Sequence, residues 1–374
     1  MKKILIVTSS YQFVRSFLIP HIDYMVRSGW IVDVASDNDG TSLPYVNKQI
    51  DIPVKRTPFH PSNIVAIKRL SQHLEREDYD IINCHTPIGA MIARLASCKA
   101  RRKGSKVIYM AHGFHFYEGA PILNWLLYYT AEKWLARYTD AIITINEEDR
   151  RNASKLLTEI SHQYYLHGVG YDVNHVGVSH KKRQNKLRAQ YNLREDDFVC
   201  LYIARYTRDK NHKFLIKALT ELQKHIPRCK FLLLGDGKEM VACRNLSCKL
   251  GLEKSVIFAG FHSKISDYLQ IVQVGVSPSV SEGLGLGLVE EMCVGLPVLA
   301  SRVRGHRDLI EDGKNGLLYT LDDTADFVSK LVYLYEHPEV RKSIGTTAQE
   351  NISKYSAENI IPQMMDIFED VLSS

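Results

Sequence analysis

The chain contains 374 residues, of which 45% are hydrophobic and 24% are charged, and it carries a formal net charge of +6 at pH 7. This length accommodates two domains with separate cores, and the composition is typical of a soluble globular protein. No apolar run is long enough and free enough of charge to span a bilayer, and Met1-Lys2-Lys3 leads directly into a strand-like segment without a signal-peptide cleavage region. We therefore expect a cytosolic protein.

The seven cysteines and the excess of positive charge limit the ligands. The cysteines are scattered and odd in number, and their spacing does not predict a zinc site, so we expect reduced thiols. The positive charge predicts an anionic partner, and a nucleotide-sugar, a lipid diphosphate and an anionic membrane surface all fit it. The sequence contains no recognised nucleic-acid-binding motif, so we expect no nucleic-acid partner.

In the first half of the chain, apolar runs alternate with amphipathic segments. Strands are predicted at residues 3–9, 31–36, 80–85, 106–110, 140–145 and 164–167, and helices at 11–27 and 61–77. This alternation predicts a doubly wound parallel sheet. Ligands bind such sheets beyond the carboxyl ends of the strands, which places along one rim Tyr11, Gln12, His85, His112 and His115.

His112 is the rim residue that we single out, because it follows a strand and precedes a glycine. An imidazole at this position can donate a hydrogen bond to a sugar hydroxyl or to a backbone carbonyl. A structural histidine bonded to a neighbouring loop is the alternative interpretation of the same pattern.

Residues 120–137 form a predicted helix that is rich in aromatic and aliphatic side chains, and the basic segment 99–106 lies just before it. A basic patch beside an aromatic amphipathic helix is typical of contact with an anionic membrane surface. The alternative interpretation of the same pattern is an ordinary helix packed on the sheet, with a solvated basic loop beside it.

Residues 173–195 are polar and basic and are predicted to cross between two domains. Beyond them the alternation resumes, with strands at 198–204, 229–234 and 256–261. Arg205 and Lys210 follow the first of these strands, and they can converge on one diphosphate, Arg205 as a bidentate fork and Lys210 as a point charge. The basic residues of the later segment 302–310 receive no role.

A glycine turn dominates the second half. Glycines at 283, 285 and 287 alternate with Leu284 and Leu286 before an apolar helix start. Glycines permit a close backbone approach, and the amides at a helix N-terminus attract an anion, so the turn is a predicted diphosphate seat. A diphosphate would repel the flanking Glu282 and Glu290, which are therefore expected to bind sugar hydroxyls.

This turn and its continuation to Ser301 resemble the donor-site signature of retaining family 4 glycosyltransferases with the GT-B architecture. Residues 80–87, 111–116 and 123–129 are similar to the bacterial exopolysaccharide and capsule members. The resemblance implies two Rossmann-like doubly wound parallel-sheet domains facing a central cleft, with a C-terminal helix crossing back to the first domain. The expected boundaries are an acceptor-binding domain at 1–172, a crossing at 173–195, a nucleotide-sugar-binding domain at 196–355 and the final helix at 356–374.

The resemblance also implies residue roles. Arg205 and Lys210 hold the donor diphosphate, Glu282 positions the sugar, Glu290 binds the ribose diol, and His112 contacts the donor sugar. Backbone groups near Phe261 line the nucleobase. Many members carry a Gly-Gly pair where this chain has Ser9-Ser10-Tyr11-Gln12, so the acceptor is assigned to Tyr11 and Gln12 together with His85 and His115.

The expected reaction is transfer of a hexose or N-acetylhexosamine, with retention, from a nucleotide-diphosphate sugar to a sugar acceptor. The donor is expected to be UDP-linked and the acceptor lipid-diphosphate-linked, at the inner face of the cell membrane. No Asp-x-Asp motif occurs in a suitable place, so we expect no metal or other cofactor. The alternatives are a nucleotide-sugar 2-epimerase on the same scaffold and a nucleotide-sugar sensor without turnover.

Overall fold

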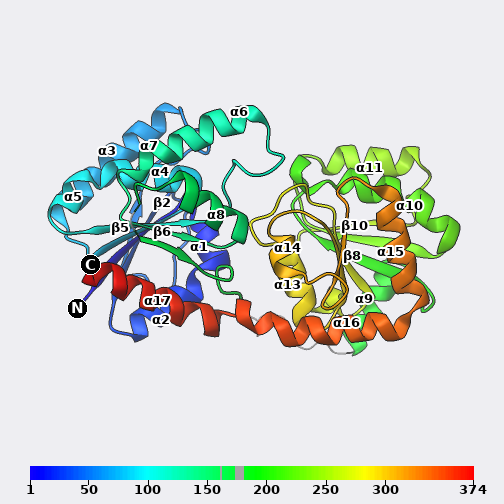
Figure 1. Ribbon diagram of the computed structural model, residues 1–374. Coiled ribbons are helices and arrows are strands. Elements are labelled where there is room, and N and C mark those ends of the chain that lie inside the picture. Colours follow the sequence, from blue (N-terminus) through cyan, green and yellow to red (C-terminus); the bar gives the residue numbers. More distant parts are fainter. Residues whose placement is uncertain (161, 173–180) are drawn as a thin grey trace. The chain divides into compact units, whose positions relative to one another are not determined.

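A computed structural model describes residues 1–160, 162–172 and 181–374, and this part of the chain forms two compact units (Figure 1). The first unit comprises Met1–Tyr171 with Ala357–Ser374, and the second comprises Asp172–Ser356. Of the expected crossing at 173–195, residues 173–180 lie outside the described residues, and Lys181–Gln190 form helix α9. Each unit is described separately below.

The first unit is built on a seven-stranded parallel sheet with the strand order β3-β2-β1-β4-β5-β6-β7. Its strands are β1 Lys3–Val7, β2 Ile31–Ser36, β3 Lys48–Asp51, β4 Ile81–His85, β5 Lys106–Ala111, β6 Ala141–Thr144 and β7 His162–Tyr165. The half-exposed edge strand β3 was missed, because Lys48-Gln49-Ile50-Asp51 has only one strongly apolar residue.

The helices of the first unit cover both faces of the sheet. They are α1 Tyr11–Phe17, α2 Ile19–Arg27, α3 Pro61–Arg76, α4 Pro87–Ala96, α5 Cys98–Arg102, α6 Ile122–Asn124, α7 Thr130–Ala136, α8 Glu147–Leu156 and α17 Ala357–Ser373, with a π-helical segment η1 at Trp125–Tyr129. The single helix expected over 11–27 is divided at Leu18, because Pro20 has no N–H to continue the hydrogen-bond ladder.

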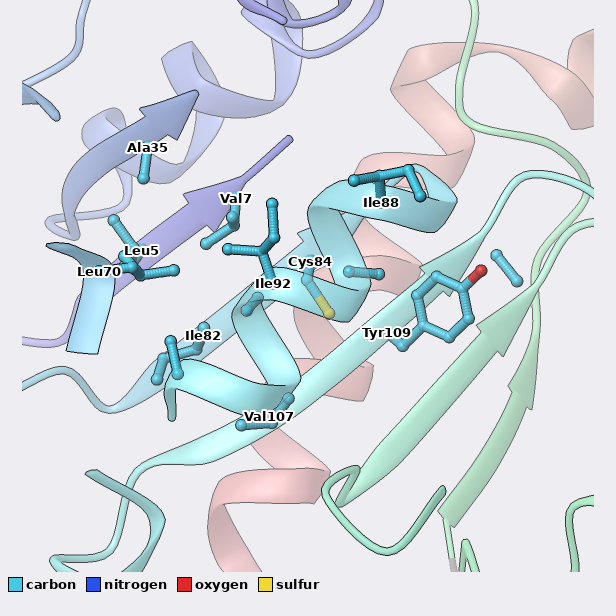
Figure 2. Close-up of a cluster of buried hydrophobic side chains, with 14 of the residues drawn as sticks. Leu5, Val7, Ala35, Leu70, Ile82, Cys84, Ile88, Ile92, Val107 and Tyr109 are labelled. Atoms are coloured by element: carbon cyan, nitrogen blue, oxygen red, sulfur yellow. The ribbon is translucent and has the colours of Figure 1, made fainter. Parts of the chain in front are cut away.

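Two cores hold the first unit together. On one face, α4 packs on the central strands through Ile88 and Ile92 (Figure 2). The approach is close at Gly89, where an added Cβ would lie 2.8 Å from the carbonyl carbon of Thr8. On the other face, the fully buried Ile360 and Phe368 of α17 pack into a core with α2, so the predicted return of the C-terminal helix to the first unit is confirmed (Figure 1).

The second unit contains a six-stranded parallel sheet with the order β10-β9-β8-β11-β12-β13. Its strands are β8 Phe198–Ile203, β9 Cys229–Leu234, β10 Val256–Gly260, β11 Val274–Ser277, β12 Val298–Ser301 and β13 Leu317–Tyr319. Its helices are α9, α10 His212–His225, α11 Met240–Lys249, α12 Ser266–Leu269, α13 Leu286–Cys293, α14 His306–Leu309, α15 Thr324–Glu336 and α16 Pro338–Asn351, with 3₁₀ turns at Arg208–Lys210 and Ile352–Tyr355. The fold class predicted from sequence, two Rossmann-like parallel-sheet domains, is confirmed.

Candidate active site

The candidate site of the second unit lies where the direction of strand progression reverses. Strand β8 has β9 on one side and β11 on the other, so the chain winds outward in both directions from β8. Ligands bind open parallel sheets at such a switch point, beyond the carboxyl ends of the strands. The loop that carries Arg205 and Lys210 follows β8, and the glycine turn follows β11. The fold therefore brings together two segments more than 70 residues apart in the sequence.

The glycine turn is tightly packed against β8. Gly285 has φ +99° at the N-terminal end of α13, a conformation that side chains other than glycine rarely adopt. A Cβ added at Gly287, in the first turn of α13, would lie 2.7 Å from the carbonyl oxygen of Ile203. The glycines thus let the helix N-terminus approach the end of β8, and they leave backbone amides at this end without helical partners.

Lys210 and Glu282 form an ion pair beside this turn. The Nζ atom of Lys210 lies 2.5 Å from Oε1 of Glu282, and the hydroxyl of Ser279 donates to the same oxygen at 2.7 Å. The Lys210 carbonyl accepts a hydrogen bond from the Tyr202 hydroxyl at 2.8 Å, which anchors the lysine backbone to β8. Burial opposes ionisation of Glu282, but the nearby Lys210 ammonium holds the pKa of this carboxyl below its ordinary value.

The remaining predicted donor-binding residues surround this pair to different degrees. Arg205 is exposed at the end of β8, and Phe261 is 71% exposed just beyond β10. Glu290 is half-buried and lies at the start of the second turn of α13. Leu284 is buried, whereas Gly283 and Leu286 are half-buried.

His306 is a site residue that sequence reasoning missed. It is fully buried at the start of α14, and its ring lies against the glycine turn, 3.1 Å from the position of a Cβ added at Gly285. Its Nε2 lies 3.2 Å from the hydroxyl of Ser277, and the neighbouring Ser279 binds Glu282. Burial lowers the pKa of His306, despite the opposing attraction of the Glu282 carboxylate, which favours a neutral imidazole.

The segment that carries His306 forms a support beneath the turn. A Cβ added at Gly305 would lie 2.8 Å from backbone atoms of Gly283 and Leu284. Nδ1 of His306 donates to the Ser301 carbonyl at 2.9 Å, and the Ser301 hydroxyl donates to the Ser279 carbonyl at 2.5 Å. In the sequence, His306 stands among three arginines, and nothing in that pattern distinguished it from a surface residue.

In the first unit, His112 and His85 form a stacked pair at the ends of β5 and β4. Nε2 of His112 lies 2.9 Å from Nδ1 of His85, and Nε2 of His85 lies 2.5 Å from Oδ1 of Asn83. Burial lowers the pKa of His112 to about 4, so its imidazole is neutral at pH 7. His112 thus has a structural partner, which is the last residue of β4 and not the loop that one interpretation expected.

Two of the four residues assigned to the acceptor need a correction. Tyr11 is 0% exposed, and its hydroxyl donates to Asp51 at 3.2 Å, so it belongs to the core. His85 is 1% exposed and supports His112. Neither side chain offers a surface to an acceptor in this structure. Gln12 is exposed, and the exposed His115 stacks on Tyr128 with ring centroids 4.5 Å apart.

Within the described ranges, no group of three or more histidine, cysteine, aspartate or glutamate side chains is arranged to hold a metal ion. Independence from metal nevertheless remains a prediction that only a chelation experiment tests.

The two parallel-sheet units and the switch-point site define the class of protein, and solved structures share this fold. A crystal structure of Anabaena Alr3699/HepE in complex with UDP and glucose matches with a TM-score of 0.79 at 21% identity, covering 99% of this chain and 100% of that one. A sucrose-phosphate synthase from Thermosynechococcus elongatus matches with a TM-score of 0.81 at 17% identity over the full length of both chains. Both neighbours are GT-B proteins, so the fold is that of the GT-B glycosyltransferases.

Sequence relatives define the family. Residues 183–351 match the model of glycosyl transferases group 1, and residues 21–158 match that of glycosyltransferase family 4. EpsD of Bacillus subtilis (strain 168), a glycosyltransferase by name, is 40% identical over 98% of this chain and 96% of its own length. An Escherichia coli UDP-Gal:alpha-D-GlcNAc-diphosphoundecaprenol alpha-1,3-galactosyltransferase is 24% identical over 80% of this chain and 77% of its own. The chain belongs to family 4 of the glycosyltransferases.

Proposed function

We propose that this protein is a retaining glycosyltransferase that moves a hexose or N-acetylhexosamine from a UDP-sugar to a lipid-diphosphate-linked sugar in exopolysaccharide or capsule assembly. The single observation that carries the proposal is the Lys210–Glu282 ion pair beside the glycine turn. It places a positive charge, a carboxylate and helix N-terminal amides in one site. A diphosphate requires the first and third of these groups, and sugar hydroxyls suit the second.

The names of relatives support the substrate classes. The Escherichia coli relative is named for a UDP-galactose donor and a diphosphoundecaprenol-linked acceptor, and the Anabaena neighbour was solved with UDP and glucose. The resemblance of residues 80–87, 111–116 and 123–129 to the bacterial exopolysaccharide and capsule members of the family is the basis for proposing exopolysaccharide or capsule assembly.

The proposed chemistry uses charge that develops as the glycosidic bond breaks. The leaving UDP gains negative charge on its diphosphate, and Arg205, Lys210 and the amides of residues 284–287 would stabilise this charge more strongly than that of the bound donor. Groups that bind the transition state more tightly than the ground state accelerate the step. The exposed side chain of Arg205 is suited to this task, because a guanidinium can bind a diphosphate bidentately.

The other roles follow from position and charge. Glu282 would position the donor sugar, Glu290 the ribose diol, and backbone groups near Phe261 the base. For His112 we propose a hydrogen bond to the donor sugar. Burial lowers the pKa of His112 to about 4, so its imidazole is neutral at pH 7 and has one N–H that can donate to a hydroxyl.

A panel of nucleotide-sugars tests the proposed function and its alternatives. The purified protein is incubated with UDP-glucose, UDP-galactose, UDP-N-acetylglucosamine or UDP-N-acetylgalactosamine. Each donor is tested with and without a lipid-diphosphate-linked sugar. Glycosylated lipid with the anomeric configuration of the donor supports the proposal. Epimerised donor in the absence of acceptor would establish the 2-epimerase instead, and an unchanged mixture with saturable UDP-sugar binding would establish the sensor.

Metal dependence is tested in the same assay. We propose that positive side chains and amides replace a divalent ion, so addition of EDTA should leave the rate unchanged. A rate that falls on chelation and returns with magnesium would contradict this part of the proposal.

A further inference from the structure

One helical segment of the first unit carries apolar side chains on its inner face and also on its exposed outer face. Segments α6, η1 and α7 together cover residues 122–136 and run along the outside of the unit (Figure 1). The inner face packs Trp125, Tyr128 and Tyr129 against the core cluster. The outer face carries an apolar stripe made of Ile122, Leu123, Leu126, Leu127 and Trp134, which are 79%, 62%, 63%, 51% and 45% exposed.

The exposed charged side chains on and just after this segment are all positive. Glu132, the one acidic residue of 122–136, is turned inward and pairs with the buried Arg94 at 2.7 Å. Lys133 is exposed beside Trp134, and Arg137 is exposed one turn further on. The apolar stripe therefore ends in cations and has no exposed carboxylate of its own.

A basic hollow continues the stripe. It has a volume of about 500 Å³ and is lined by Arg101, Arg102, Lys106, Arg137, Tyr138 and Asp140, among others. Four cations and one carboxylate give this lining a formal charge of +3. Asp140 is already bound by Arg101 at 2.6 Å, and the ring of Tyr138 lies edge-on to that of Trp134 with centroids 5.4 Å apart. The hollow and the stripe thus form one continuous surface.

We propose that the apolar stripe and the basic hollow together dock on a bilayer that contains anionic phospholipid, with a lipid phosphate in the hollow. The order of side chains matches the depth of a bilayer interface. Aliphatic residues at 122–127 enter the acyl region, Trp134 lies at the headgroup level, and the cations contact phosphates. The segment is therefore expected to bind at a tilt, with its α6 end deepest.

A further observation favours a lipid surface over a protein partner. Five large apolar side chains exposed within 13 residues offer buried area without the polar groups that a specific protein interface commonly contains. In the described part of the chain, no helix is both long and apolar enough to cross a bilayer. The inference deepens the proposed function, since a lipid-linked acceptor would lie in the same bilayer.

Co-sedimentation of the full chain with vesicles tests the proposal. Vesicles of phosphatidylcholine with 30% phosphatidylglycerol are compared with vesicles of phosphatidylcholine alone. Leu126→Ser/Leu127→Ser should lower the partition coefficient to anionic vesicles by about tenfold or more, because the lost apolar surface no longer leaves water. Val241→Ser is the matched control, since Val241 is 68% exposed in the second unit, and it should bind as the wild type does.

The hollow is tested separately. Arg102→Gln/Arg137→Gln should weaken binding to anionic vesicles by about 30-fold and leave the weak binding to phosphatidylcholine unchanged. Lys249→Gln/Lys254→Gln removes the same charge from exposed positions of the second unit and should have a much smaller effect. Equal binding of the wild type to both vesicle types would overturn the proposal. So would a self-associated wild type that the stripe variant converts to a monomer, because the stripe would then bind a second copy.

Failure of this inference is distinguishable from failure of the proposed function. Glu282→Ala should bind anionic vesicles as the wild type does, while its rate of sugar transfer falls by about 10²-fold or more. A wild-type protein that does not bind anionic vesicles but transfers sugar to a soluble acceptor analogue would overturn the proposed docking surface alone. A wild-type protein that binds anionic vesicles but transfers no sugar from any donor would support the docking surface and contradict the proposed reaction.

Discussion

Lys210 and Glu282 depend on each other. Each is only about one-fifth exposed, so neither charge is fully solvated, and the pair is held by Ser279 on one side and by the Tyr202 hydroxyl on the other. A charge in such a place is stabilised by its partner, and removal of one partner leaves the other poorly compensated. The donor would therefore meet a site whose charges are already arranged.

Replacing either member of this pair should abolish most activity. Lys210→Ala and Glu282→Ala should each lower kcat by about 10²-fold or more, because charge stabilisation at the leaving group or sugar positioning is lost. The loss of the pair should cost about 1–3 kcal/mol in the free energy of unfolding. Lys213→Ala is the control, since Lys213 forms an exposed ion pair with Glu239. Near-normal rates for both variants would refute the site assignment.

The contacts of His306 predict that it positions Glu282 through the two serines. Its Nε2 contacts Ser277, whose hydroxyl lies 3.4 Å from that of Ser279, and Ser279 donates to Glu282. His306→Ala should lower kcat by about tenfold or more, and His306→Gln, whose amide can reach Ser277, should recover part of that loss.

The comparison of variants separates positioning from simple packing. His306→Asn places its amide near the position of Nδ1 and should recover less activity than His306→Gln. Equal kcat values for the alanine, asparagine and glutamine variants, at equal thermal stability, would show that His306 does not act through this hydrogen-bond chain.

At the scale of elements, α13 and β8 are coupled by a close backbone contact. Gly287 lies where α13 approaches the last residue of β8, and the loop after β8 carries the predicted diphosphate ligands. The carbonyl of Asp209 in that loop accepts a hydrogen bond from the amide of Val280 at 2.8 Å. Movement of either element would therefore separate the two halves of the site.

Gly287→Ala should displace the N-terminus of α13. The added Cβ would lie 2.7 Å from the Ile203 carbonyl oxygen, which is too close for a rigid strand to accept. We expect about 1–3 kcal/mol of destabilisation and a rise in the Kd for UDP, measured by calorimetry. Gly251→Ala is the control for stability loss without a clash at the site, because a Cβ added at Gly251 meets nothing within 4 Å but its φ of +69° strains an alanine; this variant should lose stability and keep the affinity for UDP. Unchanged UDP affinity in Gly287→Ala would contradict the proposed seat.

At the scale of the whole molecule, stability should depend on several buried histidines. Burial lowers the pKa of His21 and of His112 to about 4, and that of His212 to about 3. The unfolded chain binds protons at these histidines near pH 6.5, whereas the folded chain does not until the pH is much lower. A histidine with a lowered folded pKa contributes its full stability above the unfolded value and loses it as the pH falls toward the folded value.

The free energy of unfolding should therefore decrease by several kcal/mol between pH 6.5 and pH 4. Urea titrations across this range measure the decrease. His212→Leu should make the decrease smaller, since this ring stacks on Tyr206 and has no hydrogen-bond partner for either nitrogen among the described residues. A wild-type curve that is flat from pH 6.5 to pH 4 would contradict the assignment of neutral buried histidines.

Nucleotide binding should stabilise the molecule in a base-dependent way. UDP at 100 times its Kd should add about 2.7 kcal/mol to the free energy of unfolding, and it should raise the melting temperature more than GDP or ADP at equal concentration. Scanning calorimetry measures both effects. A larger shift with GDP or ADP would refute the proposed UDP-sugar donor while leaving the diphosphate site in place.

The sequence by itself determined the two parallel sheets, because buried parallel strands such as β1 and β8 are continuous apolar runs that local pattern reveals. It also determined the glycine turn, since alternating glycines before a helix start indicate a tight turn with a closely approaching backbone, whatever the rest of the fold. Only the tertiary structure decided the partners of these residues. The Lys210–Glu282 pair spans 72 residues and the His306–Ser277 contact 29, and local periodicity carries no information about such pairs. Burial likewise distinguishes Tyr11 from Gln12, because a side chain's exposure depends on what the rest of the fold places against it.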